Sequence, residues 1–269
     1  MEKNINHEFN PSRVDWWIEI GGPKTTKRPF QYIEGAKIEV KEKLDYRLIT
    51  EKGDLIGLLE YLSKKPIVAV DFETNTKVTK NLFQKGAKPL CISLCGDIGK
   101  SYGIPLDYPK SPFEGNILVK SLLSDYLKDM NLLAHNKNFE ESVFELFFPP
   151  DIRVNEDTIL MSYALNEFPP HDLHNFLLTY TTLQKHKTDY LKYGNIENDE
   201  MPFNHLIEAN MADVDGTLRI YHKFKERMDK DDNLFYEEYL KKHIYSVVHH
   251  MYKEGIKIES IHSHKNVPI

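Results

Sequence analysis

Two carboxylates follow a short apolar run of the sequence. The residues IVAV (67–70) are small or β-branched, and Asp71 and Glu73 come directly after them, separated only by Phe72. Such a run is typical of a strand that is buried on both faces, and residues two apart in a strand point to the same face. The sequence therefore predicts a core strand that ends by directing two negative charges at one point.

Neighbouring carboxylates repel each other, and burial raises their pKa values unless a cation neutralises them. With little His or Cys nearby, a set of hard oxygen ligands favours Mg²⁺ or Mn²⁺, which keep several waters and also bind substrate phosphate. The alternative is that the pair simply ends the strand in solvent, since so short a motif carries a high risk of a chance match. A metal site therefore requires further acidic residues from elsewhere in the chain.

Two later segments could supply these residues. In AHNKNFEESVF (134–144), Asn136 and Glu140 fall near the start of an expected helix that follows a strand. Further on, Asp213 and Asp215 fall within a long expected helix. Residues two apart in a helix do not face the same way, so we expect only one of these two aspartates to point at the site.

Together, these segments resemble the three exonuclease motifs of the DEDD superfamily, in particular those of the proofreading 3′-5′ exonuclease domain of family A DNA polymerases. The motifs are DFET (71–74), HNKNFE (135–140) and DVDGTL (213–218). Weaker matches between them extend the resemblance from about Tyr46 to Met228. Ordered matches over this length are harder to obtain by chance than any one motif. The resemblance implies an α/β fold with a ribonuclease H-like mixed central sheet flanked by helices.

The resemblance also implies the chemistry of the site. In such domains two metal ions about 4 Å apart activate a water and stabilise the leaving 3′ oxygen as a terminal nucleotide is removed. By position, Asp71, Glu73 and Asp213 would hold the first Mg²⁺ or Mn²⁺ ion, and Asp71 with Glu140 would hold the second. These four residues are the expected catalytic and metal-binding residues.

The implied substrate is the single-stranded 3′ end of DNA, and three further residues are expected to bind it. By position in the motifs, Thr74 and Asn136 would contact the terminal nucleotide, and Phe139 would pack beneath the site. The resemblance therefore predicts a substrate site built from the first and second motifs.

Two residues depart from the family pattern. The family has Asp at the position of Glu140 and Tyr at the position of Ala209. One branch of the family uses His in place of this Tyr, at the position one residue earlier, where this chain has Glu208. The added methylene moves a carboxylate by about 1.5 Å, against a coordination tolerance near 0.2 Å. Loss of the group that orients the attacking water typically costs about a hundredfold or more in rate. The sequence leaves open whether Tyr221 or another group replaces it.

Three functions therefore stay open. The first is a metal-dependent 3′-5′ exonuclease acting on DNA, and the second is a degenerate domain of the same fold that serves as a structural or single-strand-binding module. The third is an enzyme that trims RNA 3′ ends, as ribonuclease D does. We prefer the first because Asp71, Glu73 and Asp213 are all present, although buried charges cost stability. The polymerase-like segments between the motifs place RNA trimming last.

The composition fits a globular protein. The chain has 269 residues, 41% of them hydrophobic, and a formal charge of -6, which argues against coating nucleic acid by bulk positive charge. It shows no secretory signal and no apolar run of membrane-spanning length, so we expect a cytoplasmic location and no membrane partner. Cys91 and Cys95 are expected to be buried free thiols, because no second cysteine pair completes a zinc site.

The elements that must position these residues follow from periodicity and turn signals. Strands are expected over 67–70, 88–97, 101–107 and 131–136, the second and third as an antiparallel hairpin, and helices over 54–65, 116–129, 139–148, 156–167, 171–181 and 204–228. We divide the chain into an N-terminal extension (1–45) anchored by Trp16 or Trp17, an exonuclease-like domain (46–230), and a C-terminal helix (231–269) that resembles the link to a polymerase thumb.

The helix expected over Leu234–Glu254 has an apolar face that needs a surface. It could fold back onto its own domain. It could also bind a partner, and the resemblance suggests a DNA polymerase, either as a separate polypeptide or as the remainder of a larger one. The sequence favours neither reading.

Overall fold

A computed structural model describes residues 44–77, 81–149, 152–168, 170–181, 183 and 196–255. The expectations for the N-terminal extension, including its anchors Trp16 and Trp17, fall on residues 1–43 and lie outside the described residues, as does the end of the C-terminal segment. The domain boundaries stay predictions.

The described strands form one six-stranded mixed sheet in the order β1-β4-β3-β2-β5-β6. The bounds are Asp45–Leu48 for β1, Val68–Thr74 for β2, Pro89–Asp97 for β3, Lys100–Pro105 for β4, Leu132–Ala134 for β5 and Glu156–Asp157 for β6. β3 pairs antiparallel with both β2 and β4, whereas β1 with β4, β2 with β5, and β5 with β6 are parallel. The expected hairpin and the mixed α/β sheet are confirmed, while β1 and β6 were not predicted.

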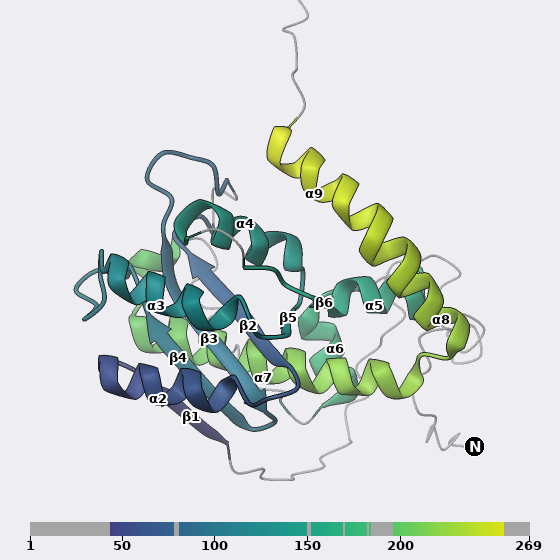
Figure 1. Cartoon of the computed structure of the whole chain (residues 1–269), viewed down its shortest axis with the longest axis horizontal. Helices are drawn as coiled ribbons and strands as arrows, with labels where there is room; N and C mark the ends of the chain where they lie inside the picture. Colours follow the sequence, from purple (N-terminus) through teal and green to yellow (C-terminus); the bar gives the residue numbers. More distant parts are fainter. Residues whose placement is uncertain are drawn as a thin grey trace, which may run out of the picture.

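Helices cover both faces of this sheet (Figure 1). On one face lie α2 (Lys52–Leu62), α3 (Ile117–Leu127) and α4 (Lys137–Phe147), and on the other lies the long α7 (Phe203–Arg227). The shorter α5 (Thr158–Leu165) and α6 (Leu173–Tyr180) pack beside α7 in a second apolar cluster. None of the described helices is long and apolar enough to cross a bilayer.

Strand β2 contributes to both faces because its side chains alternate. Val68, Val70 and Phe72 belong to the main core, together with residues of α2, α3 and α4. On the other face Ala69 packs with residues of α7. Alternation places Asp71 on the same side as Ala69, so the apolar half of the strand is packed into the core while the acidic half faces α7.

The C-terminal helical segment is an almost straight rod that begins beside α5 and passes α4 (Figure 1). It consists of α8 (Lys230–Leu234), the π-helix η3 (Phe235–Ile244) and α9 (Tyr245–Glu254). It ends at Gly255, whose φ of 68° is in the region that favours glycine after a helix. Its buried side includes Tyr236 and Leu240. Its other side exposes large apolar side chains, which are Leu234, Phe235, Tyr239, Ile244, Val247, Val248 and Met251. The segment therefore folds back onto the domain, and the other described residues leave an apolar stripe on it uncovered.

Candidate active site

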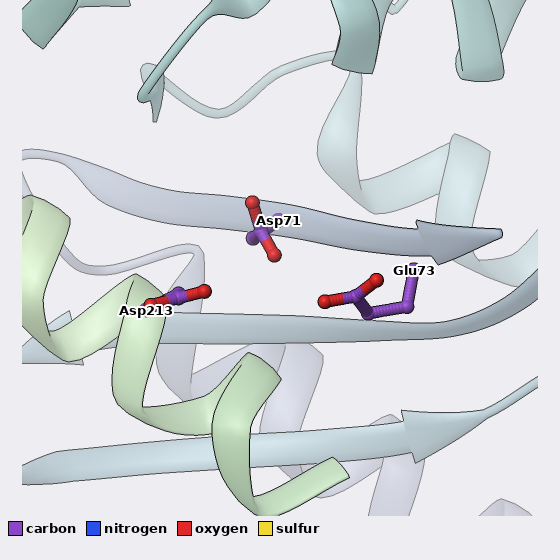
Figure 2. Close-up of side chains that lie close together, drawn as sticks. All are labelled: Asp71, Glu73 and Asp213. Atoms are coloured by element: carbon purple, nitrogen blue, oxygen red, sulfur yellow. The ribbon is translucent and has the colours of Figure 1, made fainter. Parts of the chain in front are cut away.

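Three carboxylates from two distant parts of the chain converge on one point. Asp71, Glu73 and Asp213 each offer an oxygen, and these oxygens all lie within 4.8 Å of one another. Figure 2 shows the side chains pointing toward each other, two from β2 and one from α7. The structure thus brings together three of the four acidic residues expected at the site.

The end of β2 sets the positions of two of these side chains. β5 pairs with β2 only at Val68 and Ala69, so Asp71 and Glu73 lie past the end of this parallel pairing. On the other side, the pairing with β3 shifts directly after Glu73, in the manner of a β-bulge. Bulges occur beside active sites because they redirect a side chain, and the carboxyl ends of parallel strands are the usual position of ligand sites in α/β sheets.

The long helix α7 carries two aspartates with different surroundings. Asp213 points at the other two carboxylates, whereas Asp215 is bonded within the fold. Asp215 is fully buried and accepts hydrogen bonds from the Tyr46 hydroxyl and the Gly99 backbone N–H, both at 2.8 Å. Arg219 pairs with it through Nε at 3.0 Å. The expectation that only one of Asp213 and Asp215 faces the site is confirmed, and Asp215 instead joins α7 to β1 and to the β3–β4 turn.

Two asparagines that sequence reasoning missed contact the acidic cluster. Asn210 Nδ2 donates to Asp71 Oδ2 at 2.5 Å. Asn198 Nδ2 donates to Glu73 Oε2 at 2.7 Å and to the Thr74 carbonyl at 3.0 Å. Both amides are buried. Helical spacing could have pointed to Asn210, three residues before Asp213, whereas Asn198 begins a short 3-10 helix that no sequence signal connects with β2.

Glu140 lies beside this cluster and is not part of it. It falls in the first turn of α4 and is only 2% exposed. Burial, with the nearby charge of Asp71, raises its pKa well above the usual value. Its Oε2 is buried and accepts no hydrogen bond from the residues that the structure describes. The structure therefore places a fourth carboxyl next to the other three, with one oxygen available to a ligand.

The start of α4 is held by a residue outside the three motifs. The backbone N–H groups of Asn136 and Lys137 donate to the Asp157 carboxylate at 3.0 and 3.1 Å, and Ile159 N–H donates to it at 2.8 Å. Burial raises the pKa of Asp157 despite these bonds. Asn136 itself is exposed and left-handed, with φ of 81°. Asp157 therefore fixes the start of α4, and Glu140 projects from the first turn of this helix.

A pocket of about 320 Å³ adjoins the acidic cluster. Glu73 and Thr74 line it from β2, Phe139 from α4 and Tyr252 from α9, with Lys77 beside them. Two of the three expected substrate residues, Thr74 and Phe139, therefore line the same pocket. Asn136, the third expected substrate residue, does not line this pocket.

At the two positions in α7 where the family has its water-orienting Tyr or His, this chain has neither residue. Ala209 is buried and Glu208 is exposed. Tyr221 packs against two apolar clusters away from the three carboxylates. Burial and the charges of Glu156 and Glu237 raise its pKa to about 12. Tyr221 therefore does not substitute for the family tyrosine.

Comparison with known proteins finds similarity to a DNA polymerase at the sequence level. No family model matches the chain. DNA polymerase I of Borreliella burgdorferi is 25% identical over 204 residues, which are 73% of this chain and 21% of the polymerase. The chain therefore spans about a fifth of the length of that relative.

Solved structures share the fold. RNase D of Trypanosoma brucei, in a complex with RNA U12, superposes with a TM-score of 0.56 at 15% identity, covering 84% of this chain and 77% of that chain. The EXO domain of Aedes aegypti Nibbler superposes with a TM-score of 0.52 at 16% identity, covering 72% of this chain and 96% of that chain. The ribonuclease H-like fold is confirmed, and with it the resemblance to DEDD exonuclease domains.

Proposed function

We propose that the chain is a divalent-metal-dependent 3′-5′ exonuclease that removes nucleotides from single-stranded 3′ ends. The observation that carries this proposal is the convergence of Asp71, Glu73 and Asp213 within 4.8 Å, beside a pocket. Close carboxylates are tolerated in a folded protein when a cation neutralises them. A set of oxygen ligands favours Mg²⁺ or Mn²⁺ over softer metals.

The residues at the site fit such ions. Asp71, Glu73 and Asp213 would hold one, and Asp71 with Glu140 would hold a second. The buried Oε2 of Glu140, which accepts no hydrogen bond within the described part of the chain, is an oxygen that a metal would satisfy. When bound, the ions would supply Lewis-acid stabilisation of the phosphate and an activated water.

The chain's own residues would orient the ligands and the substrate. Asn210 and Asn198 hold the Asp71 and Glu73 carboxylates by hydrogen bonds, and such outer contacts fix ligand geometry. Thr74 and Phe139 would hold the terminal nucleotide in the adjoining pocket. Ala209 offers no polar group to orient the water. We therefore expect hydrolysis about a hundredfold or more slower than with a positioned acid or base.

DNA is the first candidate substrate, and proofreading is the first candidate role, because the sequence relative is a DNA polymerase I. RNA trimming is the second candidate, and the superposition on an RNase D bound to RNA U12 favours it. We also propose residues 46–230 as the nuclease domain and a DNA polymerase polypeptide as a partner. A degenerate module that binds single strands without cutting is the alternative to both.

The test uses single-stranded DNA and RNA of the same sequence, each labelled at the 3′ end, with Mn²⁺ or Mg²⁺. We expect release of labelled mononucleotides by the wild-type protein and none by Asp71→Ala. The ratio of rates on the two strands decides between proofreading and trimming. Release from neither strand above the Asp71→Ala level would refute the enzyme and leave the binding module.

A further inference from the structure

The pocket beside Glu73 has aromatic side chains from two different helices. Phe139 comes from α4, within the second motif, and Tyr252 comes from α9, beyond the region of resemblance to the exonuclease motifs. The pocket volume of about 320 Å³ lies at the lower end of the ~300–1,000 Å³ typical of small-molecule sites. A pocket of this size suits a single nucleotide.

The helix that carries Tyr252 is attached to α4 on both sides of this residue. One turn before it, His249 Nδ1 is 2.6 Å from Asn138 Oδ1. Directly after it, Lys253 Nζ forms an ion pair with Glu145 at 2.7 Å. These contacts fix the position of Tyr252 relative to the second motif.

The Tyr252 ring is held at the pocket and still accessible. It packs against Phe83 with ring centroids 5.7 Å apart, and it keeps 40% of its surface exposed. An aromatic ring fixed on one side and open on the other is suited to stacking on a base. Tyr252 therefore offers a stacking surface that the three motifs do not supply.

The rest of the pocket matches the other parts of a nucleotide. Thr76 and Asn198 give it polar groups, and Lys77 places a cation beside Glu73. Burial lowers the pKa of Lys77 from its usual value, and the charge of Glu73 offsets only part of this effect. A cation next to the acidic cluster is complementary to a phosphate. The pocket thus combines apolar rings, polar side chains and one cation.

We propose that Tyr252 is a substrate-binding residue that stacks on the base of the 3′-terminal nucleotide, with Phe139 also lining the base site. The proposal rests on the proposed nuclease function and adds to it a specific contact from the C-terminal helix. Because every base has a π-face, such a contact would recognise single-stranded ends with little sequence preference. The C-terminal helix would then be part of the active site.

The experiment measures binding of thymidine 5′-monophosphate and adenosine 5′-monophosphate by calorimetry, with Mg²⁺ present. We expect Tyr252→Ala to weaken binding by about 5- to 150-fold, the range for one base–aromatic stack. Tyr252→Phe, which keeps the ring, should bind within about twofold of wild type. Val247→Ala, on the same helix and exposed, is the matched control and should not change binding.

A probe without a base separates stacking from a structural effect. Deoxyribose 5-phosphate should bind Tyr252→Ala and the wild type equally, and an equal loss with this probe would overturn the proposal. If Tyr252→Ala does not fold, Tyr252→Leu replaces it, since leucine keeps apolar volume without a π-face. No measurable nucleotide binding by wild type at millimolar concentration would also overturn the proposal.

Failure of this inference and failure of the nuclease proposal give different results. If mononucleotides bind through Tyr252 and no label is released from a 3′ end, the stacking site stands and the nuclease falls. If label is released and Tyr252→Ala binds nucleotides as the wild type does, the nuclease stands and the stacking site falls.

Discussion

Asp213 and Asp215 are two residues apart in α7 and lie in different environments. Asp213 meets the carboxylates of β2, whereas Asp215 is surrounded by the donors Tyr46, Gly99 and Arg219. Asp213 therefore lies near like charges, whereas Asp215 lies among hydrogen-bond donors and one cation. Their substitutions should therefore have different effects, one on stability and the other on metal binding.

Asp215→Ala should lower the free energy of unfolding by about 3–5 kcal/mol, because it leaves the guanidinium of Arg219 without its buried partner. Urea denaturation of the metal-free protein measures this. Asp213→Ala is the matched control, and it should lose Mn²⁺ binding without a comparable loss of stability. A similar loss of stability in both variants would contradict the division of roles between them.

Asn210→Ala should weaken Mn²⁺ binding by about 10- to 100-fold, since groups that orient a metal ligand have effects of this size. The physical reason is the hydrogen bond from Asn210 to Asp71. Titration of Mn²⁺ followed by electron paramagnetic resonance gives the affinity. Asn175→Ala, on α6, is the control, and equal affinities for the two variants would show that Asn210 does not orient the site.

At the residue scale, the sequence identified the side chains that bear charge and missed those that hold them. Asp71, Glu73 and Asp213 follow from strand parity, helical spacing and motif likeness. Asn198 could not be predicted, because its amide meets Glu73 through a tertiary contact between segments far apart in the sequence. Glu140 was expected as a metal ligand, and its exact relation to the other three carboxylates depends on side-chain geometry that no sequence pattern encodes.

At the scale of elements, the site depends on a close approach of α7 to the sheet. A Cβ at Gly103 in β4 would lie 2.6 Å from Ile207 Cγ1 and 3.2 Å from Met211 Cγ, both on α7. Glycine is therefore required where the helix lies directly on the strand. The same helix carries Asp213, so this packing supports the position of the third carboxylate.

Gly103→Ala should destabilise the protein by about 1–3 kcal/mol, the usual cost of overpacking a core contact. Gly57→Ala is the matched control, because its Cβ would meet nothing within 4 Å and alanine favours the helix α2. The control should gain about 0.4–1 kcal/mol. Chemical denaturation of both variants checks the sign, and a stabilised Gly103→Ala would contradict the close packing.

Long periodic elements could be predicted, and short or unusual ones could not. The helices α2 to α7 and the β3–β4 hairpin have clear apolar periodicity or turn residues between them. Strand β6 has only two residues, Glu156–Asp157, and β1 has the mostly polar sequence DYRL, so neither carries a pattern. The π-helix η3 was missed because its apolar pattern reads as an ordinary amphipathic helix.

At the scale of the whole molecule, repulsion within the acidic cluster destabilises the folded state, and a bound cation should reduce this repulsion. Binding of Mn²⁺ to the folded state alone should stabilise it by about 2.7 kcal/mol at 100 times the Kd. For a protein of this size the Tm should rise by about 5–10 °C. Thermal unfolding with and without Mn²⁺ measures the shift. Asp71→Ala should show no such increase, and an equal increase in that variant would place the ion elsewhere.

The exposed apolar stripe of the C-terminal rod is the surface on which the proposed polymerase partner would bind. Replacing Val247 and Met251 together by lysine should change the stability by less than about 1 kcal/mol, since both side chains are exposed. It should abolish co-elution with the cognate polymerase in size-exclusion chromatography. Co-elution of both the variant and the wild type would exclude this stripe as the contact, and a wild-type protein that elutes alone would remove the partner.

The alternation of β2 also restricts how the chain can fold. A slip of one residue in the pairing of this strand would exchange its two faces. Asp71 and Glu73 would then be forced beneath α2 and α4 among apolar side chains, and the valines would face α7 instead. Desolvating two unpaired carboxylates costs several kcal/mol each, so misregistered intermediates are unstable. The residues proposed for catalysis thus also disfavour incorrect pairing of β2 while the sheet forms.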